Sequence, residues 1–137
     1  MADLSVTAAS VQLMSSANTQ RVQAGEAGIT QGMSVYMDTA DSDKWKKCIN
    51  TSAAAALAGG IALTPAGDDE YFLIVTSGKV DLGATLAVGE VYGVSDTAGK
   101  IRPVVDDGTG DFVTILGVAT AADALDVQIR ASGVVHA

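Results

Sequence analysis

The segment Leu125-Asp126-Val127-Gln128-Ile129-Arg130 decides the fold class of this chain, because its apolar and polar side chains alternate with the period of a half-buried strand. Outward from it, glycine and aspartate turns separate four further stretches that predict strands, at residues 71–76, 90–95, 100–105 and 112–118. Short strands with turns at intervals of about 8 to 12 residues are typical of a small sandwich or barrel. The sequence therefore predicts an all-β fold, a small β-barrel or β-tulip-like domain.

Individual stretches carry more detailed predictions. Residues 33–37 and 44–49 are expected to form a hairpin whose lysines face water. Residues 71–76 are apolar at alternate and adjacent positions, so both faces of that strand are expected to be covered. Pro103 cannot donate a backbone hydrogen bond, which predicts an edge position for residues 100–105.

The alanine-rich residues 52–58 predict the one helix of the domain, since alanine and leucine have high helix propensity and Thr51 or Ser52 can cap the first turn. Gly59 and Gly60 are expected to end it. A helix of two turns is stable only when it packs on the sheet, so we expect it to plug one end of the barrel.

Domain organisation follows from a change in composition. Residues 1–24 are rich in Ala, Ser, Thr, Gln and Val and contain no glycine or proline, and they predict an extended N-terminal arm. The alternatives are a first strand of the domain or a disordered end. Residues 25–137 predict a single compact β domain.

Charge and hydropathy exclude several partners. The 137-residue chain has 16 acidic and 8 basic residues and a formal charge of −8, which repels nucleic acid and anionic lipid. No apolar stretch reaches 18 residues and the N-terminus has no cationic start, so we expect neither a membrane span nor Sec export. Cys48 is the single cysteine, which fits synthesis in a reducing cytoplasm.

No stretch assembles a catalytic, cofactor or metal site. His136 is the only histidine and lies at the C-terminus, away from any expected nucleophile. Residues 106–111 cluster aspartates around glycine, but an EF-hand loop starting there would need glutamate at Gly117, so we interpret them as a solvated turn. The sequence predicts a protein that is not an enzyme and has no cofactor. Trp45 is either an interface anchor or an ordinary core residue.

Several segments together resemble one protein family. The quoted features are the Ala/Ser/Thr-rich arm, Gly28-Ile29-Thr30-Gln31-Gly32 with Val35-Tyr36, Ala53 to Leu63, Tyr71 to Gly78, Val88 to Ser95 and Ile115 to Ala119. In this order they resemble the small head-decoration, or cement, proteins of tailed bacteriophages. That resemblance implies a homotrimer on the exterior of the virion, made in the host cytoplasm, that binds the major capsid protein and stabilises the expanded head.

The arm is the expected capsid-binding element. An extended arm can add a strand to a capsid sheet, and its apolar side chains would fill alternate pockets. The residues expected to do so are Leu4, Val6, Val11, Leu13 and Met14. The alternative function is a small glycan- or receptor-binding β domain on a virion or bacterial surface, although the chain has only six aromatic residues for sugar stacking.

Overall fold

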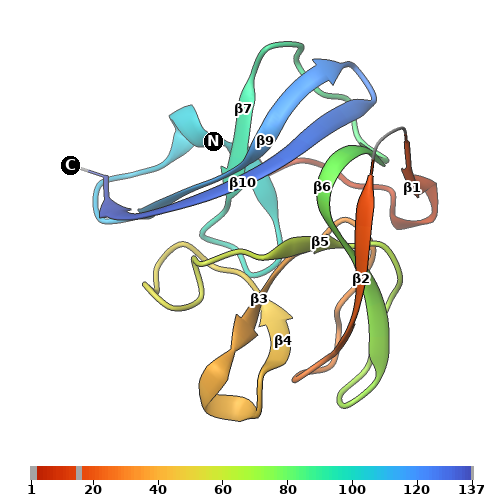
Figure 1. Ribbon diagram of the computed structural model, residues 1–137. Coiled ribbons are helices and arrows are strands. Elements are labelled where there is room, and N and C mark those ends of the chain that lie inside the picture. Colours follow the sequence, from red (N-terminus) through yellow and green to blue (C-terminus); the bar gives the residue numbers. More distant parts are fainter. Residues whose placement is uncertain (1–2, 15–16, 137) are drawn as a thin grey trace.

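The computed structural model describes residues 3–14 and 17–136. It is a curled, antiparallel half-barrel, so the expected all-β, barrel-like fold is confirmed (Figure 1). The strand order is β4-β3-β5-β6-β10-β9-β7-β8, with β1 and β2 also paired to β6. The ten strands are β1 (Val11–Leu13), β2 (Asn18–Gln23), β3 (Ser34–Asp38), β4 (Lys44–Lys47), β5 (Gly60–Ala62), β6 (Tyr71–Leu82), β7 (Val91–Val94), β8 (Ile101–Pro103), β9 (Phe112–Ala121) and β10 (Ala124–Val135). Three single-turn 3-10 helices are η1 (Ala8–Ser10), η2 (Thr39–Asp41) and η3 (Val104–Asp106).

Strand β6 joins the two halves of the molecule. Its first half pairs with β2 and β5, and its second half pairs with β10 and β1. In Figure 1 the lower half therefore contains β2 to β5, and the upper half contains β7, β9 and β10. Gly78, at a φ of +92°, lies where β6 passes from one half to the other.

Each half has its own hydrophobic core. Phe72 and Ile74 of β6 pack with Trp45 of β4 in the lower core. The upper core is larger and contains buried residues of β6, β7, β9 and β10, including Val80, Tyr92, Leu116, Leu125 and Val127. Because β6 contributes side chains to both, the two halves share a continuous hydrogen-bonded scaffold.

Most predicted hairpins are confirmed. Strands β3 and β4 pair in register from Val35 to Asp38, and β7 pairs with β8. Strand β8, which contains Pro103, lies at the edge of the sheet as expected. The lysines of β4 are ion-paired and only about a quarter exposed, because acidic residues of the adjacent loops approach them.

The prediction that residues 71–76 are covered on both faces is wrong at one end. Ile74 and Val75 are neighbours that are both fully buried, Ile74 in the lower core and Val75 in the upper core. Tyr71 and Leu73, however, are 57% and 40% exposed. The two cores meet only where the halves join, so the start of β6 has one face in water.

The predicted helix at residues 52–58 is also wrong, because this stretch forms consecutive turns. Only the bond from the Ala56 amide to the Ser52 carbonyl has α-helical spacing. The segment is bent back by a bond from the Ile49 amide to the Ala55 carbonyl, and the Thr114 hydroxyl bonds to the Ala56 carbonyl. Such a short segment gains too little from propensity to offset helix nucleation, so these longer-range bonds decide its path.

Candidate functional site: the N-terminal segment and its docking surface

Residues 3–14 lie against the domain instead of extending away from it. The Leu4 amide donates to the Ile101 carbonyl at 2.8 Å, the Thr7 amide to the Gly83 carbonyl at 2.8 Å and the Met14 amide to the Lys79 carbonyl at 3.0 Å. Between these contacts, β1 pairs with the end of β6, from Leu82 to Val80. Within the N-terminal segment, Val11–Leu13 therefore form an edge strand of its own domain in this structure.

Strand β2 continues the same edge. It pairs antiparallel with β6 from Ser77 back to Tyr71, so both parts of the predicted arm follow one long strand. The alternatives for residues 1–24 were an extended arm, a first strand of the domain and a disordered end. Within this range, residues 11–13 and 18–23 form strands paired with the domain. Binding of this segment to a capsid stays a prediction.

The five predicted capsid-binding residues divide into two groups. Leu4 and Val11 pack against the upper core, and Val6 is half-buried beside them. Leu13 and Met14 point outward and are 46% and 38% exposed. Only the last two present substantial apolar surface to a partner while the segment stays docked.

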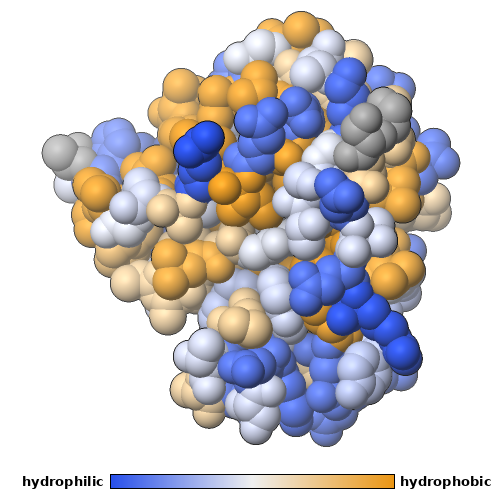
Figure 2. Space-filling model, viewed as in Figure 1, coloured by the Kyte–Doolittle hydropathy of each residue, from blue (hydrophilic) through white to orange (hydrophobic). Residues whose placement is uncertain are grey.

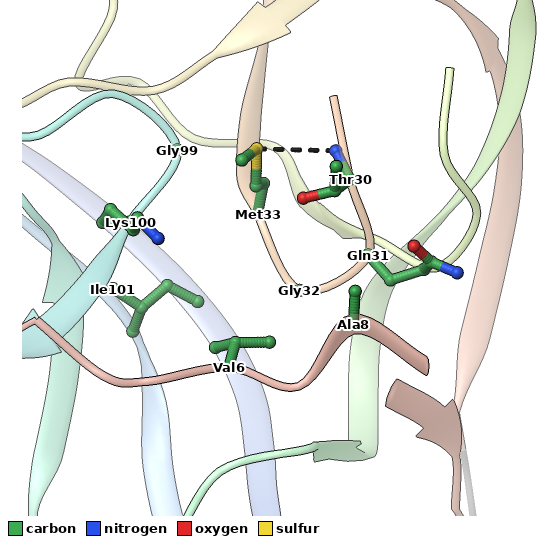
Figure 3. Close-up of a pocket in the computed structure, with 9 residues that line it drawn as sticks. All are labelled: Val6, Ala8, Thr30, Gln31, Gly32, Met33, Gly99, Lys100 and Ile101. Atoms are coloured by element: carbon green, nitrogen blue, oxygen red, sulfur yellow. Dashed lines mark hydrogen bonds between the residues drawn. The ribbon is translucent and has the colours of Figure 1, made fainter. Parts of the chain in front are cut away.

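A small cavity separates the N-terminal segment from the domain (Figure 3). Val6 and Ala8 form one wall, the turn from Thr30 to Met33 forms another, and Gly99, Lys100 and Ile101 complete it. Its volume is about 50 Å³. Ligand pockets usually measure about 300 to 1,000 Å³, so this space suits water and is too small for a cofactor.

Glycine at position 32 makes the docking of the segment possible. Gly32 has a φ of +86°, and a Cβ atom there would lie 2.6 Å from Cγ1 of Val6. Any other residue would be strained in this backbone conformation and would also displace Val6. The turn at Gly32 is thus part of the surface on which the N-terminal segment docks. The sequence motif from Gly28 to Gly32 indicated a turn but not this contact.

Trp45 lies in the lower core with 9% of its surface exposed. Its ring covers Gly59, where an added Cβ atom would lie 2.6 Å from Cη2. Of the two alternatives for Trp45, the structure therefore places it in the core, and little of its surface is available to a partner.

A buried ionic cluster surrounds Arg102, whose side chain is 4% exposed. Its guanidinium group lies 3.1 Å from Asp96, 3.4 Å from Asp107 and 2.9 Å from Asp111. Burial raises the pKa of the Asp107 carboxyl, and the attraction of Arg102 opposes that rise.

This cluster corrects the interpretation of residues 106–111 as a solvated turn at one position, Asp107, whereas residues 108–110 are exposed as expected. Asp107 is 8% exposed, because the β7–β8 hairpin brings Arg102 against the loop. The guanidinium of Arg102 pairs with both Asp107 and Asp111, so ion pairs within the chain hold the loop. A basic residue followed by aspartates at intervals of five and nine residues was the available sequence signal.

Two further reactive groups, Cys48 and His136, lie outside this cluster. Burial raises the pKa of the Cys48 thiol to about 12, so it is protonated and a poor nucleophile at neutral pH. The backbone of His136 bonds to Gly110 and Asp111. Among residues 3–14 and 17–136, no cluster of three or more metal-ligating side chains occurs, and no helix has the length and apolarity to cross a bilayer.

Comparisons with known proteins add no relative. No protein-family model, curated protein or solved structure matches this chain.

Proposed function

We propose that this protein is a structural component of a tailed-phage virion that binds the exterior of the capsid and cements neighbouring major capsid protein subunits. The observation that carries the proposal is the N-terminal edge strand, which presents Leu13 and Met14 to solvent at the end of β1. One edge of β1 pairs with β6. Its other edge suits strand addition by an extended segment of a capsid subunit.

Multivalency supplies the strength that one short strand lacks. Each net hydrogen bond contributes about 0.5 to 1.5 kcal/mol, so a three-residue strand binds weakly by itself. In the proposed homotrimer three such strands engage one particle, and avidity exceeds single-site affinity by about 10² to 10⁴. Stable attachment then requires no covalent chemistry.

Point variants test this proposal better than deletion of the segment, because deletion would uncover the core residues that Leu4 and Val11 contact. We expect Leu13→Asp combined with Met14→Asp to abolish co-sedimentation with expanded capsids that lack the protein. Binding would then require the two new carboxylates to lose their hydration, which is unfavourable, whereas the core of the unbound protein would not be disturbed.

Met37→Asp is the matched control, since Met37 is 45% exposed on β3 in the other half of the molecule. This variant should bind capsids like the wild type. Saturation of capsids by the Leu13 and Met14 double variant would show that the N-terminal segment is not the attachment site.

The glycan-binding alternative has one structural feature in its favour. Tyr71 is an aromatic residue with 57% exposure, as a stacking platform requires. However, the guanidinium carbon of Arg21 lies 4.7 Å from the centre of its ring and occupies one ring face. The cement function is therefore the better supported of the two.

A further inference from the structure

The outer edge of β2 is an open strand edge. On its inner side, β2 pairs with β6 in unbroken register along residues 19–23 (Figure 1). Within the part of the chain that the structure describes, no backbone hydrogen bond outside this pairing involves residues 19–22. Thr19, Gln20 and Arg21 are all exposed, so solvent reaches the outer edge.

The pairing with β6 fixes which backbone groups of β2 point outward. Opposed residues of an antiparallel pair alternate between those that exchange both backbone hydrogen bonds and those that exchange none. The Ala24 amide donates to the carbonyl of Glu70, the residue opposite it in this register, at 2.7 Å. Counting back from this bonded pair, every second residue of β2 bonds to β6, so the amide and carbonyl groups of Arg21 and Thr19 point away from it.

Contacts within the chain limit the open edge at both ends. At one end, the Asn18 carbonyl accepts a hydrogen bond from the Thr76 hydroxyl at 3.3 Å. At the other end, the Gly25 amide donates to the Trp45 carbonyl at 2.7 Å, so β4 flanks the chain there. The four outward backbone groups between these ends match the donors and acceptors of one short added strand.

Arg21 gives this edge a positive charge. Its guanidinium carbon lies 4.7 Å from the centre of the Tyr71 ring, which holds the side chain on the exposed face of β2 and β6. Every ion pair among the described residues involves Arg102 or a lysine of β4, and none involves Arg21. Its guanidinium group is therefore available to a carboxylate from outside the chain.

We infer that the outer edge of β2 binds an extended segment of a partner protein, which adds a strand to the sheet and places a carboxylate side chain opposite Arg21. Directly opposed residues of neighbouring strands share a face, and opposite charges there stabilise the pairing. Figure 2 shows a mainly hydrophilic surface over the lower half of the molecule, to which β2 belongs. Such a surface suits recognition by backbone hydrogen bonds and charge.

Charge disfavours a second copy of this chain as the partner. β2 contains no acidic residue, so pairing of two β2 strands would place no carboxylate opposite Arg21. Each copy also carries a net charge of −8, and the two would repel one another. We therefore assign the segment to another protein. Under the proposed function that protein is the major capsid protein, bound at a second edge besides that of β1.

Amide hydrogen exchange of the full chain, followed by nuclear magnetic resonance, tests both the open edge and its occupation. In the free protein the Thr19 and Arg21 amides should exchange at least about tenfold faster than those of Gln20 and Val22, which bond to β6. The probe is the peptide acetyl-Thr-Val-Glu-Val-Thr-amide, whose threonines and valines favour strands. At high peptide concentration, exchange at Thr19 and Arg21 should slow at least about twofold.

A matched peptide with lysine in place of glutamate tests the charge. The wild type should bind the glutamate peptide about two- to fivefold more tightly, whereas Arg21→Ala should bind the two alike. Arg21→Pro also removes the outward amide hydrogen, which β6 does not use, and should abolish binding of both. Arg130→Ala removes an exposed arginine of β10 and should keep the preference for glutamate. Circular dichroism confirms that each variant is folded.

Three results would overturn the assignment: equal exchange at Thr19 and Gln20 in the free protein, no slowing with either peptide, or equal affinity of the wild type for both peptides. These measurements decide the matter even when Arg21→Pro unfolds. Dimerisation that Arg21→Pro abolishes would place a second copy at the edge instead. No capsid is used, so this assignment and the capsid binding tested at Leu13 and Met14 can fail separately.

Discussion

The two halves of the molecule each contain a cluster of ion pairs, in opposite environments. In the lower half, Lys46 of β4 lies 2.9 Å from Asp38 and 3.3 Å from Asp41, and its side chain is 26% exposed. In the upper half, Arg102 of β8 contacts three carboxylates with its side chain only 4% exposed. Distances are similar in the two clusters, whereas access to water is not.

Solvation decides what each cluster contributes. Exposed charges remain hydrated when a partner is removed, so their pairing adds little to stability. A buried charge that loses its partner has no water to replace it, so breaking a buried pair is far more costly than the net value of the pair. The upper cluster should therefore be much more sensitive to substitution than the lower one.

The largest effect is expected from Arg102→Ala. It leaves the buried carboxylate of Asp107 without its cation and should lower the free energy of unfolding by about 3–5 kcal/mol. Urea unfolding monitored by circular dichroism measures the change. Lys100→Ala, an exposed cation two residues away, is the control, and equal losses in the two variants would refute the importance of burial.

A smaller effect, within about 1 kcal/mol of the wild type at neutral pH, is expected from Asp107→Asn, because Arg102 keeps Asp96 and Asp111 as partners. The pKa of Asp107 is raised in the folded state above its ordinary value of 3.8. Its protonated form thus favours folding, and that contribution is lost as the pH rises through the raised pKa.

The stability of the wild type should consequently fall relative to Asp107→Asn as the pH increases from about 3.8 through the raised pKa. Urea midpoints of both proteins across this range test the sign. An opposite trend would mean that the attraction of Arg102 exceeds the desolvation of the carboxyl group.

The smallest effect is expected from Lys46→Ala in the lower cluster. Its hydrogen bonds to Asp38 and Asp41 raise the pKa of the Lys46 ammonium group, but all three side chains remain accessible to water. Any destabilisation should disappear in about 1 M salt, where the screening length is about 3 Å. A large loss that persists in high salt would contradict the contrast between the two clusters.

Local sequence pattern predicted the strands because alternation reports which side chains share a face, and that requires no knowledge of distant residues. It identified β10, the β7–β8 hairpin and the edge position of Pro103. It failed at residues 52–58, where long-range hydrogen bonds override alanine propensity. It also failed at Tyr71 and Leu73, since coverage of a strand depends on what packs against it.

The sequence likewise predicted only part of the candidate site. The apolar residues of the N-terminal segment were identified by type, but their division into docked Leu4 and Val11 and exposed Leu13 and Met14 depends on pairing with β6. The Arg102 cluster was missed, because only the folded hairpin brings its carboxylates together.

The amino-acid sequence by itself determined the all-β class, the positions of the principal strands and turns, and the acidic surface of this protein. These properties follow from backbone preferences, side-chain periodicity and charge, all of which act within a few residues. Tertiary structure alone decided which edge of β6 receives the N-terminal segment and which charges lose their water. Such properties depend on contacts between residues far apart in the chain, whose energies arise only when folding has excluded solvent between them.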